Sequence, residues 1–155
     1  MSNGDWIERY AAGPDELRRA VEAMTDEQRR ARPVTGRWST HEVVCHLADF
    51  EPIYADRMKR VIAETEPTFF GGDPDLFAAS LAYDQRETSI ELDLIAAVRS
   101  QMARILRSLS EEYFTRIGNH SEAGPVTLAV LLQRITDHIP HHVAFVAEKR
   151  RALGL

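Results

Sequence analysis

The chain has 155 residues, of which 44% are hydrophobic and 28% charged, and its formal net charge is −5 at pH 7. This length fits a single domain over residues 1–155, and the acidic balance argues against binding to the phosphate backbone of nucleic acids. Cys45 is the only cysteine, which excludes an intrachain disulfide and fits a reducing compartment. No apolar stretch approaches the length of a membrane span. We therefore expect a cytoplasmic protein that acts on small molecules, without nucleic acid or membrane partners.

Two helical segments are expected near the start of the chain. Gly13-Pro14 followed by two acidic residues is typical of a helix start, and apolar residues then recur at helical spacing to Met24. Thr25 and Gln28 fit a capping box, in which each side chain bonds the backbone of the other. They predict a second, shorter helix.

The next segment predicts a long amphipathic helix. Ser39 and Glu42 fit another capping box, and apolar residues recur every three or four positions over residues 43–61. We expect this helix to run to about Glu64. Pro52 lies inside it and should bend it, because proline removes one backbone donor.

The second half of the chain predicts two further long helices. A short helix is expected over residues 75–82, and Thr88 with Glu91 predicts the cap of the third long helix. Residues 118–125 are expected to form a loop, and Thr127 to cap a last helix that ends near Gly154. No segment alternates as a strand does. Four long helices with short additional helices therefore predict an all-α four-helix bundle.

Three histidines are the main candidates for a functional site. His138 and His142 lie one turn apart on the last helix and point the same way, and His46 lies on the apolar stripe of the earlier helix. Neutral imidazole is the commonest protein metal ligand, and three such ligands leave the open position of a catalytic zinc site. The alternative is three core histidines, each bonded to a carbonyl or carboxylate. Because burying several imidazoles without partners is unfavourable, a shared cation is preferred.

The other histidines are expected to differ in role. His41 falls on the opposite side of its helix from His46, so a solvated side chain is expected. His141 should flank the metal site. His120 precedes the last helix, either at the mouth of the bundle or in water.

Two acidic residues near His46 have more than one explanation. Asp49 follows His46 by three residues and can orient an imidazole or act as a base, although an exposed helix surface explains it equally well. Glu42 can reach a metal, but its place in the capping box explains it sufficiently. Cys45 is expected to be a small buried side chain rather than a ligand.

Two motifs resemble the signatures of the DinB-like superfamily. The first is Trp38-Ser39-x-x-Glu42-x-x-x-His46-Leu47-x-Asp49, followed by Arg57; the second is His138-x-x-His141-His142, preceded by Gly124-Pro125-Val126-Thr127-Leu128. The resemblance covers about residues 5–153. It implies a four-helix bundle of uncommon connectivity, often a homodimer. It also implies a divalent ion held by one histidine of the second helix and two of the last, which are His46, His138 and His142 here.

The resemblance also bears on the reaction. Characterised members of this superfamily include S-transferases that use a low-molecular-weight thiol, bacillithiol or mycothiol, and a mycothiol-dependent isomerase. We therefore expect a metal-dependent transferase in which zinc, or else nickel, iron or manganese, lowers the pKa of a thiol cosubstrate. Asp49 and His141 are the candidate catalytic residues.

Two alternatives use the same three histidines. A hydrolase would use the ion to activate water. A non-enzymatic helical module would keep the metal for structure alone, and a fourth protein ligand, from Glu42 or His120, would favour it.

Overall fold

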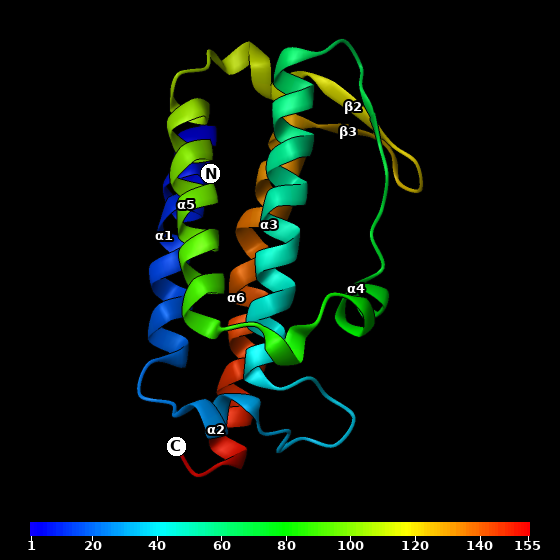
Figure 1. Cartoon of the computed structure of the whole chain (residues 1–155). Helices are drawn as coiled ribbons and strands as arrows, with labels where there is room; N and C mark the ends of the chain where they lie inside the picture. The colour runs from blue at the N-terminus through cyan, green and yellow to red at the C-terminus, as the bar shows by residue number, and fades with distance from the viewer.

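In the computed structural model, which describes all 155 residues, four long helices run side by side (Figure 1). They are α1 (Asn3–Val21), α3 (Thr40–Ala63), α5 (Thr88–Arg107) and α6 (Leu128–Ala152). Their connections hold the short helices α2 (Asp26–Arg30) and α4 (Pro74–Ser80), and the 3₁₀ helices η1 (Tyr83–Gln85) and η2 (Glu111–Thr115). The predicted four-helix bundle is confirmed. None of its helices has the length and apolar composition that crossing a membrane requires.

The order of the helices around the bundle differs from their order along the chain. Both α1 and α3 pack against α5 and α6, so α1 and α3 occupy opposite corners. Figure 1 shows α3 and α5 running in the same direction, joined by a long connection that returns along the outside through α4. Helices α1 and α6 run the opposite way. Helix α3, which carries His46, therefore lies antiparallel to and in contact with α6, which carries His138 and His142.

The capping signals predicted three of the helix starts. Thr25 with Gln28 caps α2, and Ser39 with Glu42 caps α3, each pair making both bonds of a capping box. The Thr127 side chain accepts from the backbone N–H of Val130 at the start of α6. These signals are local, since donor and acceptor lie three residues apart.

The cap predicted at Thr88 is wrong. Helix α5 follows Glu87, which makes no side-chain cap. The Thr88 hydroxyl instead lies 2.8 Å from Nδ1 of His41, and Glu91 accepts from Arg86. Both side chains are therefore used in contacts outside their own helix.

The helix start predicted at Gly13-Pro14 is also wrong, because α1 begins at Asn3 and Pro14 lies inside it. Proline has no N–H, so the carbonyl four residues earlier, that of Tyr10, loses its donor within the helix. Nη1 of Arg99 donates to this carbonyl at 2.9 Å. A Cβ added to Gly13 would lie 2.2 Å from the same nitrogen. Gly13 therefore leaves room for an arginine of α5, and Pro14 leaves the Tyr10 carbonyl free to accept a hydrogen bond from it.

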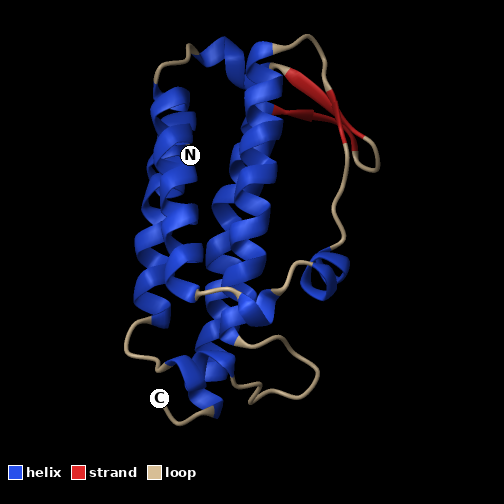
Figure 2. Ribbon diagram, viewed as in Figure 1, coloured by secondary structure: helices blue, strands red, loops and turns tan.

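A small three-stranded sheet occupies the region predicted as a loop, and it corrects the expectation that the chain has no strands (Figure 2). Strand β1 (Thr68–Phe69) pairs in parallel with β2 (Ile117–His120), and β2 pairs antiparallel with β3 (Gly124–Thr127). These strands have two to four residues, which is too short for an alternating pattern to be recognised. The sheet places His120 beside the long connection between α3 and α5.

A buried ion pair separates the apolar core into two clusters. One cluster contains Tyr10, Met58, Leu106 and Leu132, and the other contains Leu17, Leu47, Ile95 and Val146. Along each helix the two sets lie on either side of one level, which is occupied by Gly13, Glu51, Arg99 and Ile135. Glu51 and Arg99 are both 0% exposed.

The Arg99 guanidinium, which projects from α5, bonds to the other three long helices at this level. Its Nε and Nη2 donate to Glu51 of α3 at 2.9 and 2.5 Å. Nη2 also donates to the carbonyl of Ile135 in α6 at 2.7 Å, and Nη1 donates to Tyr10 of α1. The charge is thus neutralised by one carboxylate, and its remaining bonds go to two backbone carbonyls.

We predict that Arg99→Met lowers the free energy of unfolding by about 3–5 kcal/mol, because it leaves the Glu51 carboxylate buried without a cation. Urea denaturation measures this loss. Arg107→Met is the matched control, since Arg107 lies on the same helix in an exposed pair with Glu8 and should cost less than about 1 kcal/mol. Equal losses for the two variants would contradict the role assigned to Arg99.

Candidate metal centre

Three histidines from two neighbouring helices meet at one point between α3 and α6. One ring nitrogen each from His46, His138 and His142 lie within 4.8 Å of one another. Nε2 of His46 and Nε2 of His138 are 3.0 Å apart. The spacing of four residues places the two α6 rings on one face of their helix, and the packing of α3 against that face adds the third.

These rings lack the partners that ordinary core histidines have. Nδ1 of all three side chains is buried without a hydrogen-bond partner. No hydrogen bond joins them to a carbonyl or carboxylate, and the one polar contact among them is that between His46 and His138. The structure therefore does not contain three core histidines that are each bonded to a carbonyl or carboxylate. Three imidazole nitrogens are instead a donor set that fits a divalent metal ion.

Burial keeps the three rings neutral. It lowers the pKa of His46 to about 4, of His142 to about 3 and of His138 to about 2. The neighbouring imidazoles lower the pKa of His138 and His142 further, whereas the charge of Asp49 acts in the opposite direction on His46. Neutral imidazole is the form that binds a metal ion, so the cluster is ready to bind one at pH 7.

Aromatic side chains hold the rings in place. The His46 ring packs between Trp38 and Phe50, at centroid distances of 5.2 and 4.8 Å. Phe145 packs 5.8 Å from the His142 ring. Trp38 thus limits the rotation of a candidate ligand.

The three histidines form part of the wall of a cavity of about 380 Å³. The wall also includes Arg57 and Arg134 from the two helices, and His120 and Glu122 from the β2–β3 hairpin. The connection after β1 closes one side, where a Cβ on Gly71 would lie 2.7 Å from a carboxylate oxygen of Glu122. The sequence left two positions open for His120, at the mouth of the bundle or in water, and in the structure this residue lies at the mouth.

The two candidate catalytic residues lie in different places. His141 is exposed, lines the cavity, and packs 5.2 Å from the His142 ring. Asp49 is not among the cavity-lining residues, and its carboxylate accepts from the Tyr83 hydroxyl at 2.7 Å and from Arg86 at 2.9 Å. No hydrogen bond joins Asp49 to His46. The geometry therefore does not place Asp49 as the group that orients this imidazole.

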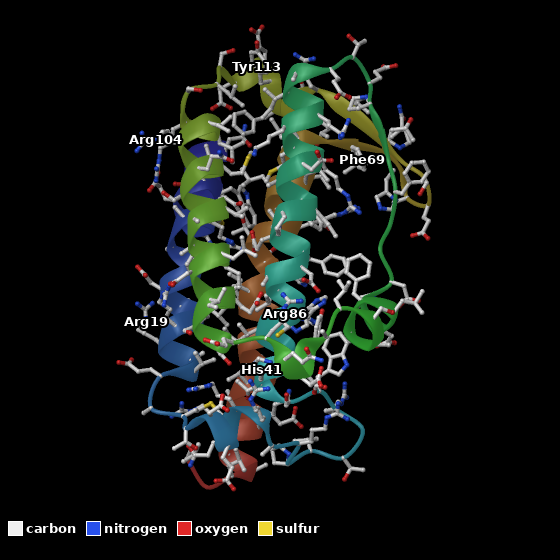
Figure 3. The ribbon with its side chains drawn as sticks, in the orientation of Figure 1. Arg19, His41, Phe69, Arg86, Arg104 and Tyr113 are labelled. Atoms are coloured by element: carbon white, nitrogen blue, oxygen red, sulfur yellow. The ribbon has the colours of Figure 1, made fainter.

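The solvated position predicted for His41 is wrong, because this side chain is 2% exposed. Its Nε2 donates to the carbonyl of Tyr83 at 2.6 Å, and its Nδ1 contacts Thr88. Figure 3 labels His41 and Arg86 in the lower half of the bundle. The segment between α4 and α5 covers this face of α3, and the pattern of α3 alone does not reveal such a cover.

Two other sequence interpretations near the site are confirmed. The Glu42 carboxylate accepts from the backbone N–H of Ser39 and from Arg32, so it belongs to the cap. Cys45 is buried, and burial raises the pKa of its thiol to about 12. It is therefore neither a ligand nor a reactive thiol at neutral pH.

The sequence analysis assigned no role to the charged residues of the cavity, although the position of one of them in its helix is unusual. Arg57 falls among the inward-facing positions of α3, in line with Phe50 and Tyr54. A charged side chain at such a position is unusual. Arg134 and Glu122 gave no comparable signal, because both are exposed.

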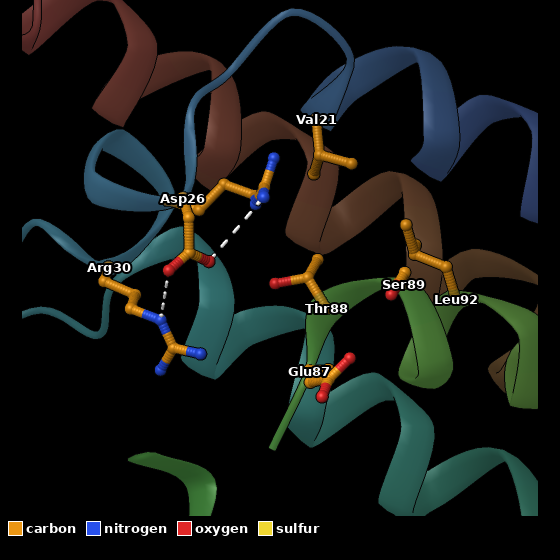
Figure 4. A pocket seen from close by; sticks show the side chains of 8 residues that line it. Val21, Asp26, Arg30, Glu87, Thr88, Ser89 and Leu92 are labelled. Atoms are coloured by element: carbon orange, nitrogen blue, oxygen red, sulfur yellow. Dashed lines mark hydrogen bonds and ion pairs between the residues drawn. The ribbon is translucent and has the colours of Figure 1, made fainter. Parts of the chain in front are cut away.

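Another cavity, of about 400 Å³, lies between α2 and the start of α5 (Figure 4). Its charged groups are largely paired with one another, since Asp26 forms ion pairs with Arg29 and Arg30 at 3.6 and 2.9 Å. It contains no cluster of metal-ligating side chains. The cavity at the three histidines is therefore the better candidate site.

Comparison with known proteins shows relatives along almost the whole chain. The chain is 29% identical over 150 residues to the "Putative metal-dependent hydrolase YfiT" of Bacillus subtilis, covering 96% of this chain and 84% of that protein. It is 26% identical over 149 residues to a "Putative metal-dependent hydrolase" of Bacillus cereus, covering 96% and 86%.

Solved structures agree with these relatives. The structure of YfiT from Bacillus subtilis, described as "a probable metal-dependent hydrolase with an unusual four-helix bundle topology", matches with a TM-score of 0.92 at 28% identity, covering 99% of this chain and 90% of that one. A DinB-like protein from the same species, YjoA, matches in fold with a TM-score of 0.63 at 20% identity, covering 97% and 93%. The relatives and the three-histidine cluster together support a metal-dependent protein. Because the family described as the DinB superfamily matches residues 9–146, the chain belongs to the DinB superfamily.

Proposed function

We propose that this protein is a metal-dependent enzyme that transfers a low-molecular-weight thiol to an electrophile, with His46, His138 and His142 as the ligands of a divalent ion. The observation that carries this proposal is the meeting of three neutral, otherwise unpartnered rings at the wall of a cavity. Structural zinc sites close with four protein ligands, whereas catalytic sites keep a position open. Glu42 is committed to the α3 cap, so a structural site would lack this fourth ligand.

The chemistry follows from this donor set. A divalent ion bound by three imidazoles lowers the pKa of a thiol or a water molecule in its open position. Zinc is the expected ion, although imidazole also suits nickel, iron and manganese sites. His141 is the exposed acid–base group beside the cluster, and in this proposal it accepts the proton of the thiol. The thiolate sulfur then bonds to the electrophilic carbon, and the leaving group departs with its bonding electron pair.

Hydrolysis is the second candidate, and the names of the relatives favour it. Here His141 would take a proton from water, and the water oxygen would bond to the carbonyl or phosphoryl centre of the substrate. The leaving group would depart with its bonding electron pair and receive the proton from His141. The same three ligands serve both reactions, so the site alone does not distinguish a transferase from a hydrolase. The two reactions differ in the nucleophile, which is a thiol in the first and water in the second.

The metal content of the purified protein tests the proposed ligands. Purified protein should hold about one equivalent of a divalent metal, and His138→Ala should reduce this to near zero, because two ligands seldom retain an ion that needs three. Mass spectrometry of the metals in the purified samples measures both values. His120→Ala is the control, since His120 lines the cavity outside the cluster, and its metal content should stay unchanged. Equal metal in all three samples would show that the ligands lie elsewhere.

The second prediction concerns the nucleophile. With N-acetylcysteine and 1-chloro-2,4-dinitrobenzene, the metal-loaded protein should form the thioether at least about tenfold faster than the uncatalysed reaction. The same preparation should hydrolyse p-nitrophenyl acetate no faster than His138→Ala does. Rapid ester hydrolysis without thiol, and no thioether formation, would replace the transferase by the hydrolase.

The third prediction concerns pH. The unfolded chain protonates its histidines near the ordinary pKa of 6.5, whereas the three folded rings stay neutral to about pH 4 or below. With respect to these three rings, the metal-free protein is therefore most stable above pH 6.5 and loses stability as the pH falls below that value. Between pH 7 and pH 5, the free energy of unfolding of His138→Gln should therefore fall by about 1–2 kcal/mol less than that of the wild type. Urea unfolding at the two pH values measures it, and an unchanged loss would contradict a buried neutral ring at this position.

A further inference from the structure

Arg57 is a buried cation without a carboxylate partner. It is 5% exposed and forms no ion pair, in contrast to Arg99, the other buried arginine, which is neutralised by Glu51. Nη2 of Arg57 donates to the carbonyl of Phe70 at 2.5 Å, and its Nε is buried without a partner. Since buried charges are normally paired, this guanidinium lacks an anion.

The place where an anion would bind is the cavity of the three histidines. Arg57 lines this cavity, and so does Arg134 from α6, which also forms no ion pair. The single carboxylate in the wall is that of Glu122, which is exposed and pairs with neither arginine. With neutral histidines the wall therefore has an excess of positive charge, and a divalent ion would increase it.

Structural contacts account for only part of the Arg57 guanidinium. Its bond to Phe70 fixes the connection after β1, and its guanidinium lies over the rings of Tyr54 and Phe69, with centroid distances of 5.0 and 5.6 Å. The carbonyl bond uses one of the five guanidinium N–H groups. A neutral donor would serve the same carbonyl without the cost of burying a charge.

We infer that this cavity takes a small molecule with a carboxylate or phosphate group, which Arg57 and Arg134 bind while its reacting end faces His46, His138 and His142. Guanidinium groups bind these oxyanions through paired, charge-assisted hydrogen bonds. The volume of about 380 Å³ falls in the range of small-molecule sites. The inference rests on the proposed function only for the reacting end, because the anion contacts involve different residues.

The test is calorimetric titration of the full-length protein at pH 7 and low salt, with inorganic phosphate and with succinate as the two probes. Arg134→Gln and Arg57→Gln should each weaken binding by about ten- to a hundredfold, the effect of losing a hydrogen bond to a charged group. Arg104→Gln is the control, because Arg104 is exposed on α5 (Figure 3), and this helix contributes no residue to the cavity. Its affinity should not change. Arg134 is also exposed, so its variant remains informative if Arg57→Gln does not fold.

The outcomes separate the two proposals. Binding of phosphate alone, or of succinate alone, supports the inference and identifies the group. Absence of binding for both probes, or equal affinity in wild type and Arg134→Gln, overturns it. Repeating the titration after chelator treatment, and with His138→Ala, should leave the arginine-dependent binding in place. If the wild type holds no metal but still binds the anion through these arginines, the proposed function fails while the anion site stands.

Discussion

The architecture depends on one buried guanidinium. Arg99 bonds to Tyr10, Glu51 and Ile135, and so fixes α5 to the other three long helices at a single level. Pro14 lacks the N–H that would otherwise bond the Tyr10 carbonyl, so this carbonyl is free to accept from Arg99, and the adjacent Gly13 leaves the space. Ile135 lies one helical turn before His138. The pair with Glu51 therefore holds α3 and α6 in register close to the point where the histidines meet.

The sequence predicted those parts of the fold whose signals are local. Capping boxes and apolar periodicity identified α2, α3 and α6, and the spacing of His138 and His142 identified a shared face. Two of the errors involve partners that are distant in sequence. Pro14 is tolerated inside a helix because of Arg99, and His41 is buried because the segment before α5 covers it. The short β2–β3 hairpin gave no periodic signal.

The candidate site concentrates groups that a folding core alone would not favour. Eight buried side-chain atoms have no hydrogen-bond partner, and four of them lie at this one cavity: Nδ1 of the three imidazoles and Nε of Arg57. The other four belong to Tyr10, Arg29, Thr40 and Glu51, outside the cavity. Elsewhere the buried polar groups are mostly paired, as in the contacts of Arg99 and His41. Such local departures from polar pairing are typical of sites that bind something. A divalent ion for the imidazoles and an oxyanion for the guanidinium would complete both sets of contacts.

The central claim is that the three imidazoles share one ion, and diffraction from metal-loaded crystals at the absorption edge of the bound metal tests it most directly. We expect one anomalous peak between α3 and α6, about 2.0–2.1 Å from a nitrogen of each of His46, His138 and His142 if the metal is zinc. A loaded crystal with no peak there, and with the three rings bonded to ordinary acceptors, would contradict the account.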